Sequence, residues 1–80
     1  MDIKKELSDL ISQRTGYALE KITGATEFKQ DLNLSHVELI EFISEVEKNF
    51  KVNFSDEEIS QIKIVSDLEE LLLDQLEATN

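Results

Sequence analysis

The apolar residues of this chain recur at spacings of three and four along several stretches, which is the pattern of amphipathic helices. The first stretch predicts a helix over 3–14, whose apolar face consists of Ile3, Leu7, Leu10 and Ile11. Asp2 stands where a helix start needs a capping side chain, and Gly16 stands just past the end, where the left-handed cap favours glycine. Both ends of this helix are therefore marked in the sequence.

The main helix of the chain is predicted to begin near residue 36. Its core-facing residues are Leu39, Phe42, Ile43, Val46 and Phe50. Later apolar runs predict a short helix over 56–61 and a last helix over 66–76, with Leu68, Leu71 and Leu72 facing inward. We expect one core to form between these helices, in which the following residues are buried together: Phe28, Ile43, Val46, Phe50, Ile62 and Leu68.

Each of the three later helices is preceded by the S-x-x-E spacing of a capping box. In this motif the serine hydroxyl accepts from the backbone N–H three residues on, and the glutamate accepts from the backbone N–H of the serine. The pairs are Ser35 with Glu38, Ser55 with Glu58, and Ser66 with Glu69. Three boxes ahead of three apolar runs indicate three helix starts.

The connection over 17–34 is long for a compact domain, and such loops often have a function. We expect its apolar residues to pack against the core: Tyr17, Leu19, Ile22, Phe28, Leu32 and Leu34. The connector 50–54 (FKVNF) alternates like a strand, but no second strand is available to pair with it, so we interpret it as a loop.

These elements predict an all-α fold, a small four-helix bundle of three longer helices and one short one, with a long loop between the first two helices. Eighty residues are enough for a single domain, 1–80. The chain has no cysteine, so it forms no disulfide and has no thiolate. No apolar run approaches the roughly 20 residues of a membrane span, and the N-terminal segment is charged rather than signal-like, so we expect a cytoplasmic protein.

Charge is distributed unevenly along the chain. Eighteen acidic residues against eight basic ones give a net charge of −10, and residues 31–80 carry all of this excess. Such a surface argues against nucleic-acid binding, which requires a basic face. It favours protein partners that have a basic docking surface, although an acidic surface also serves solubility alone.

The segment from Asp31 to Phe42 (DLNLSHVELIEF) resembles the signature of the acyl carrier proteins, which runs D-L-G-x-D-S-L-D-x-V-E-L. Asp31 and Leu32 match its opening. The later part is matched conservatively by Val37, Glu38, Ile40, Glu41 and Phe42, and the end of the acidic helix by Glu47 and Phe50. The resemblance extends without gaps over nearly the whole chain and includes Gly16, Ile22, Thr23, Phe28, Asp56, Glu57, Glu58, Ile62 and Val65.

This resemblance implies a helical bundle of the acyl-carrier type, active in fatty acid or polyketide metabolism as a carrier and not as an enzyme. The family attaches 4′-phosphopantetheine to a serine at the start of the second helix, and acids of that helix dock basic patches on synthase, acyl-transfer and phosphopantetheinyl-transferase enzymes. The corresponding docking residues here are Val37, Glu38, Glu41, Glu45 and Glu47. The expected protein is a monomer without catalytic residues or a metal site.

The attachment motif itself departs from the family. In an ungapped register the D-S-L core falls on Ser35-His36-Val37, so that His36 occupies the serine position. Ser35 is the nearest hydroxyl and has two possible roles: a plain N-cap, or an attachment site one residue early. His36 is either a solvent-exposed residue of the first turn or a contact for a ligand. The alternative function is thus an interaction module of the same fold that carries nothing.

Asn33, Ser44 and Lys48 also depart from the family. Asn33 replaces the motif glycine, and asparagine tolerates the left-handed conformation that such a position requires. Ser44 and Lys48 replace an apolar and an acidic residue that carriers often have on the docking helix. These two differences bear on which partners dock, and they leave the predicted fold unchanged.

Overall fold

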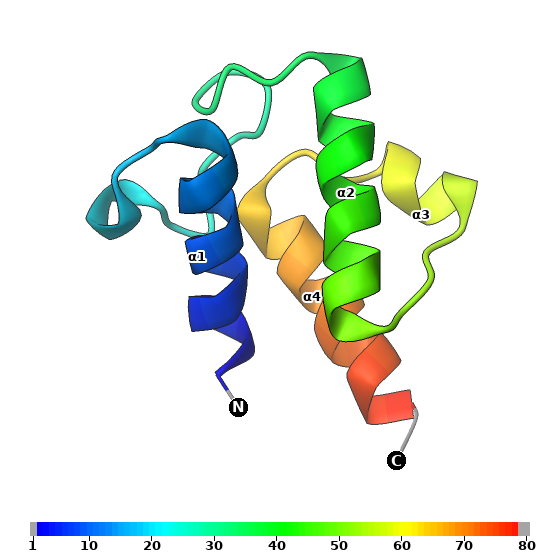
Figure 1. Ribbon diagram of the computed structural model, residues 1–80. Helices are drawn as coiled ribbons and strands as arrows, with labels where there is room; N and C mark the ends of the chain where they lie inside the picture. Colours follow the sequence, from blue (N-terminus) through cyan, green and yellow to red (C-terminus); the bar gives the residue numbers. More distant parts are fainter. Residues whose placement is uncertain (1, 79–80) are drawn as a thin grey trace.

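The computed structural model describes residues 2–78, and over this range the chain forms four α-helices and one short 3-10 helix (Figure 1). In chain order they are α1 (Ile3–Thr15), the 3-10 helix η1 (Leu19–Lys21), α2 (His36–Phe50), α3 (Asp56–Ser60) and α4 (Val65–Ala78). The only extended pairing in the described residues is an isolated bridge between Glu27 and Ile64. The predicted all-α bundle with a long first loop is confirmed.

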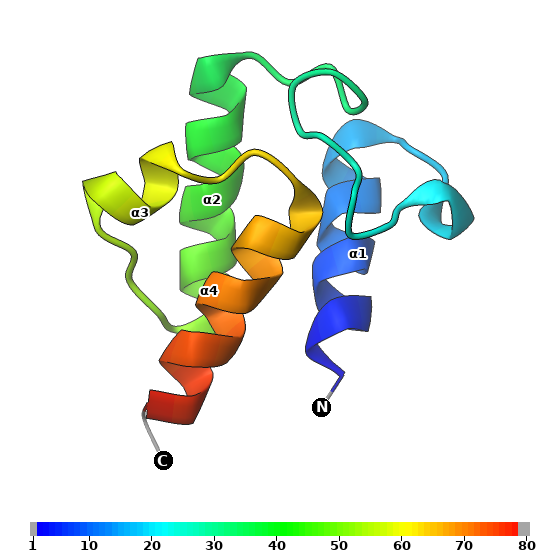
Figure 2. The same cartoon turned by 180° about the vertical axis from the view of Figure 1, so that it is seen from behind.

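The three longer helices enclose the core, and α3 lies beside α2 on the side away from α1 (Figures 1 and 2). The most deeply buried side chains are Leu7, Ile11, Phe28, Phe42, Ile43, Val46, Leu68 and Leu72. The rings of Phe28, from the loop, and Phe42, from α2, meet at a centroid distance of 6.1 Å. All six residues predicted to share the core belong to it.

The long loop is anchored to the rest of the molecule at both its apolar and its backbone groups. Phe28 and Leu32 are buried, and Tyr17, Ile22 and Leu34 pack against the core from its edge. The prediction for Leu19 was wrong: this side chain is 42% exposed, because it belongs to η1, which lies outside the enclosed core.

Backbone hydrogen bonds join the loop to the start of α4. The N–H of Phe28 donates to Lys63 O (3.1 Å), that of Val65 to Thr26 O (3.0 Å), and that of Ser66 to Gly24 O (2.9 Å). A Cβ atom at Gly24 would meet the Ser66 hydroxyl, so a larger residue at this position would have to turn that side chain aside. The loop therefore brings the chain to the start of α2 along a defined path.

Most of the predicted helix ends are confirmed. Asp2 caps α1 by accepting from Lys5 N (3.2 Å), and Gly16 ends it at φ 76°. Asn33 has a φ of 57°, as expected for a residue in a glycine position just before α2.

The start of α4 differs from the prediction. The helix begins at Val65, one residue earlier than expected, and Ser66 lies within its first turn rather than at its cap. The first N–H groups of the helix, those of Val65 and Ser66, donate to the loop carbonyls of Thr26 and Gly24. The carboxylate of Asp67 accepts from Lys63 N (2.9 Å) and Ile64 N (3.0 Å) just ahead of the helix, so the predicted box of Ser66 and Glu69 is not formed. The other differences are small, since α3 ends at Ser60 and α4 continues to Ala78.

Residues 51–54 of this connector form a loop, as predicted, while Phe50 is the last residue of α2. Val52 and Phe54 are buried in the same core as the helices, which explains their alternation without a partner strand. Lys51 ends α2 in the left-handed conformation, with φ 57°. No helix within residues 2–78 is long and apolar enough to cross a membrane.

Candidate functional site: the start and acidic face of the second helix

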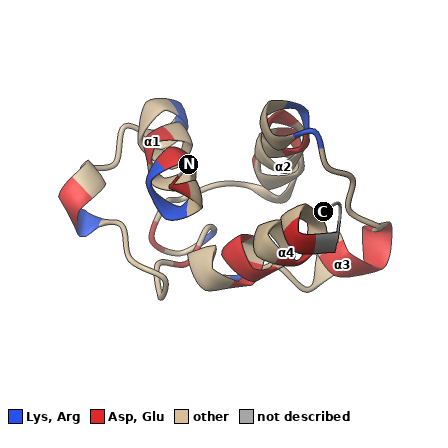
Figure 3. Cartoon of the chain, turned by 90° about the horizontal axis from the view of Figure 1, so that it is seen from below, with Lys and Arg blue, Asp and Glu red and all other residues tan. Residues whose placement is uncertain are grey.

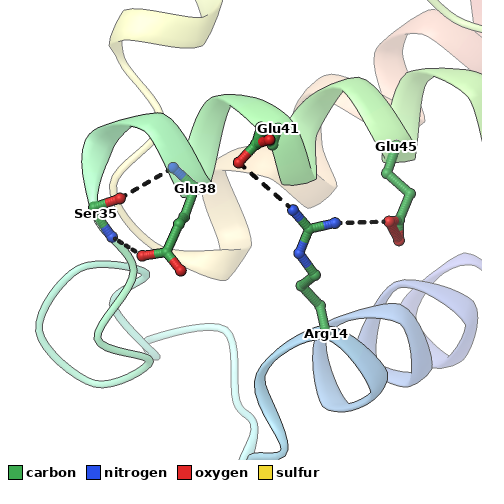
Figure 4. Close-up of polar contacts among 5 residues, drawn as sticks. All are labelled: Arg14, Ser35, Glu38, Glu41 and Glu45. Carbon is green, nitrogen blue, oxygen red and sulfur yellow. Dashed lines mark hydrogen bonds and ion pairs between the residues drawn. The ribbon is translucent and has the colours of Figure 1, made fainter.

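Ser35 is the N-cap of α2 and forms the predicted capping box with Glu38 (Figure 4). Its hydroxyl accepts from the Glu38 N–H at 3.1 Å, and its own N–H donates to Glu38 Oε1 at 2.9 Å. The hydroxyl thus accepts the hydrogen bond that caps the helix, and the residue lies at the surface.

The capping box also affects the acidity of Glu38. The hydrogen bond from the backbone N–H of Ser35, then that involving its hydroxyl, and to a smaller extent the positive charge of Arg14, hold the pKa of Glu38 below its usual 4.5. These groups favour the ionised carboxylate more than burial disfavours it. Glu38 is therefore a fixed negative charge of the first turn at neutral pH.

His36 is the first residue of α2 and its side chain is exposed. A phosphodiester to a side chain requires a hydroxyl oxygen, and an imidazole offers only ring nitrogens. Phosphopantetheine therefore does not fit at this residue. Ser35 has the required oxygen one position earlier, in the capping geometry described above.

Val37 follows directly and is 66% exposed, more than the two other exposed large apolar side chains within residues 2–78, Leu19 (42%) and Leu73 (39%). Glu41 lies one turn further along the same surface, and Ser44 and Lys48 are also exposed. The predicted docking residues Val37, Glu38 and Glu41 therefore lie together at one end of α2, beside the candidate attachment position.

The remaining predicted docking acids have contacts within the protein. Glu45 Oε2 accepts from Arg14 Nη1 at 3.0 Å, and Arg14 Nη2 lies 3.9 Å from Glu41 Oε1 (Figure 4). Glu47 Oε2 accepts from the N–H of Phe54 at 2.8 Å. Glu47 therefore holds the connector after α2, in addition to any role on the surface.

Arg14 was not among the residues that the sequence pointed to. It lies in the last turn of α1, where a basic residue is favoured by the helix dipole. Its pairing with α2 depends on how the two helices pack, which local spacing does not show.

Acidic residues also cover α3 and α4, as Figure 3 shows. Within residues 2–78, no group of three or more His, Asp or Glu side chains is arranged to hold a metal ion.

Comparison with known proteins identifies the family. A family model described as "Phosphopantetheine attachment site" matches residues 5–72. The acyl carrier protein of Aster yellows witches'-broom phytoplasma (strain AYWB) is 35% identical over 66 residues, 82% of this chain and 87% of the relative. That of Coprothermobacter proteolyticus is 33% identical over 70 residues, 88% of this chain and 85% of the relative.

Solved structures agree with this assignment. The crystal structure of an acyl carrier protein from Thermotoga maritima has a TM-score of 0.82 at 29% identity, covering 100% of this chain and 96% of that one. The acyl carrier protein of Enterococcus faecalis has a TM-score of 0.80 at 23% identity, covering 91% and 92%, which supports the fold. The chain belongs to the phosphopantetheine-attachment family. It is an acyl-carrier-protein-like carrier domain and not an enzyme, and the group that its family carries is 4′-phosphopantetheine.

Proposed function

We propose that this protein is an acyl-carrier-type module, a monomer of the cytoplasm, which docks partner enzymes of fatty acid or polyketide metabolism through α2. One observation carries the proposal: an exposed valine, Val37, lies next to the ionised Glu38 and the exposed Glu41 at the start of the helix. An apolar centre with acidic neighbours is a surface that a basic, partly apolar patch can complement.

We further propose that the unaltered chain docks without carrying the phosphopantetheine arm. His36 has no hydroxyl, and the Ser35 hydroxyl accepts the hydrogen bond that caps α2. The helix start and its capping box are present at this position, so we propose that the missing hydroxyl at residue 36 is the main barrier. The result is an interaction module with the fold and docking helix of a carrier.

Attachment at Ser35 is the second candidate function. It is favoured by the surface position of this serine at a helix N-terminus, where free N–H groups stabilise a phosphate. In that case the protein is an ordinary carrier with its site moved by one residue.

Incubation with coenzyme A and a broad-specificity phosphopantetheinyl transferase, followed by intact mass measurement, separates the two candidates. We expect the unaltered protein and His36→Ala to keep their mass and His36→Ser to gain one phosphopantetheine. The double variant Ser35→Ala/His36→Ser should also gain it, which places the group at position 36.

Two results would count against this account. Modification of the unaltered protein at Ser35 supports the ordinary carrier instead. Failure of His36→Ser to accept the group, while a known carrier protein in the same reaction is converted, shows that more than one side chain separates this protein from a carrier.

A further inference from the structure

Arg14 links α1 to the docking face of α2 through two carboxylates. Its Nη1 lies 3.0 Å from Glu45 Oε2 and its Nη2 lies 3.9 Å from Glu41 Oε1. The two glutamates are four residues apart and therefore neighbours on consecutive turns of one helix face. A planar guanidinium with several donors can serve both at once, which the single ammonium of a lysine does less well.

These groups remain within reach of a partner. The side chain of Arg14 is 32% exposed, that of Glu45 38% and that of Glu41 60%. Ion pairs at such exposed positions are weak, since water and salt screen them. A guanidinium or ammonium group from outside can therefore take the place of Arg14 without disturbing the core.

We infer that Arg14 is an internal competitor for the docking face. In the free protein its guanidinium occupies Glu41 and Glu45, and a partner with a basic docking surface has to displace it. The inference rests on the proposed docking through α2 and adds a determinant of affinity from another helix. Arg14 also places a positive charge beside that face, which repels basic partners.

The competition predicts the direction in which the affinity for basic partners changes when Arg14 is removed. Removing Arg14 frees two carboxylates and removes a repelling charge, so basic partners should bind more tightly. If Arg14 only held α1 against α2, its removal would loosen the docking helix, and binding would stay the same or weaken. The two interpretations therefore predict opposite changes in affinity.

The test uses a synthetic amphipathic helical peptide with an Arg- and Lys-rich face as the probe. Its dissociation constant is measured by fluorescence anisotropy, and its contact surface by amide chemical shifts of the protein. We compare the unaltered protein with Arg14→Gln and, as a matched control, with Lys21→Gln. Lys21 is exposed on η1, away from α2 in both views of the fold, and its replacement changes the net charge equally.

We expect Arg14→Gln to bind about two- to fivefold more tightly, the range that a weak exposed ion pair can supply. Lys21→Gln should bind like the unaltered protein at physiological salt, where the Debye length is about 8 Å. Arg14→Lys keeps the positive charge but loses the planar guanidinium that serves both glutamates. Its affinity for the peptide should lie between those of the unaltered protein and Arg14→Gln. Thermal melts of each variant show whether the fold is retained.

The possible failures are distinguishable. If the peptide shifts no α2 amide of the unaltered protein, docking through α2 is wrong, and the inference falls with it. If the peptide shifts α2 but Arg14→Gln binds no more tightly than Lys21→Gln, docking stands and the role of Arg14 as a competitor is wrong.

Discussion

The starts of α2 and α3 have the same capping box in very different surroundings. At Ser35 and Glu38 the two hydrogen bonds measure 2.9 and 3.1 Å, and at Ser55 and Glu58 they measure 2.8 and 3.1 Å. The helix behind the first box has 15 residues, five of them buried. The helix behind the second has five residues, and none of these five is buried.

This comparison separates local structure from function. The S-x-x-E motif supplies a helix start in both places, because it satisfies the same backbone groups. The Ser35 hydroxyl has the geometry of an ordinary cap, shared with a serine to which the family resemblance assigns no attachment. What makes the first box a candidate site is the long, core-anchored α2 with Val37 and its acidic neighbours.

The largest expected effect concerns the anchoring of the two helices. Phe42 is 1% exposed in α2, so Phe42→Ala should cost about 3–5 kcal/mol of unfolding free energy through lost burial and a cavity. Ile59 of α3 is only half-buried, and Ile59→Ala should cost less than half as much. Urea unfolding measures both values. Equal costs would mean that α3 is anchored as firmly as α2, and the contrast between the two helices would fail.

The two caps themselves give a smaller effect. Ser35→Ala should lower the global unfolding free energy by about 1 kcal/mol, the usual value of a lost N-cap. Ser55→Ala should mainly release α3, because this helix can open without the core. Hydrogen exchange should therefore accelerate at the amide of Ile59, which donates to Ser55 O. A global loss at Ser55 as large as that at Ser35 would contradict this difference.

Salt should stabilise the protein modestly. Residues 31–80 hold both boxes and all of the negative excess, so repulsion within this part opposes the compact state. Raising the salt concentration from low to physiological screens this repulsion, and the melting temperature should rise by a few degrees. An unchanged melting temperature would show that repulsion between the acidic residues does not measurably destabilise the folded protein.

The smallest effect concerns pH. Because the pKa of Glu38 is lowered in the folded protein, its contribution to stability is complete above its usual 4.5 and is lost as the pH falls through the lowered value. Glu38→Gln keeps an acceptor for the Ser35 N–H but has no proton to gain. Acid titrations followed by circular dichroism should therefore show a flatter loss of stability below about pH 4.5 for this variant. Parallel curves for the two proteins would contradict the role of the charge.

Local signals predicted most of the fold. The predictions from the apolar spacing of α2 and from the boxes at Ser35 and Ser55 are confirmed, because the interactions on which they depend lie within one or two helical turns. The prediction of a box at Ser66 was wrong because the loop pairs with this segment. The N–H groups of Val65 and Ser66 donate to Thr26 O and Gly24 O, so loop carbonyls satisfy the start of the helix. The segment 50–54 was interpreted only as a loop, and the burial of Val52 and Phe54 was not predicted, because it depends on how the connector folds back onto the helices.

The candidate site was also predicted only where it depends on residues close together in the sequence. Ser35, His36 and the acids of α2 follow from the motif, which is continuous in the chain. The pairing of Arg14 with Glu41 and Glu45 joins residues of two different helices, so the spacing of residues within either helix does not predict it. The bond from Phe54 N to Glu47 also depends on how the connector folds back onto α2.

The mass of the protein purified from the cells that make it naturally tests the central claim most directly. Intact mass measurement, followed by peptide mapping of the segment that contains Ser35 and His36, shows whether the chain carries the family's group. Our account predicts the mass of the unmodified polypeptide, with a free hydroxyl on Ser35. A phosphopantetheine that maps to Ser35 would contradict it and would make this protein an ordinary carrier.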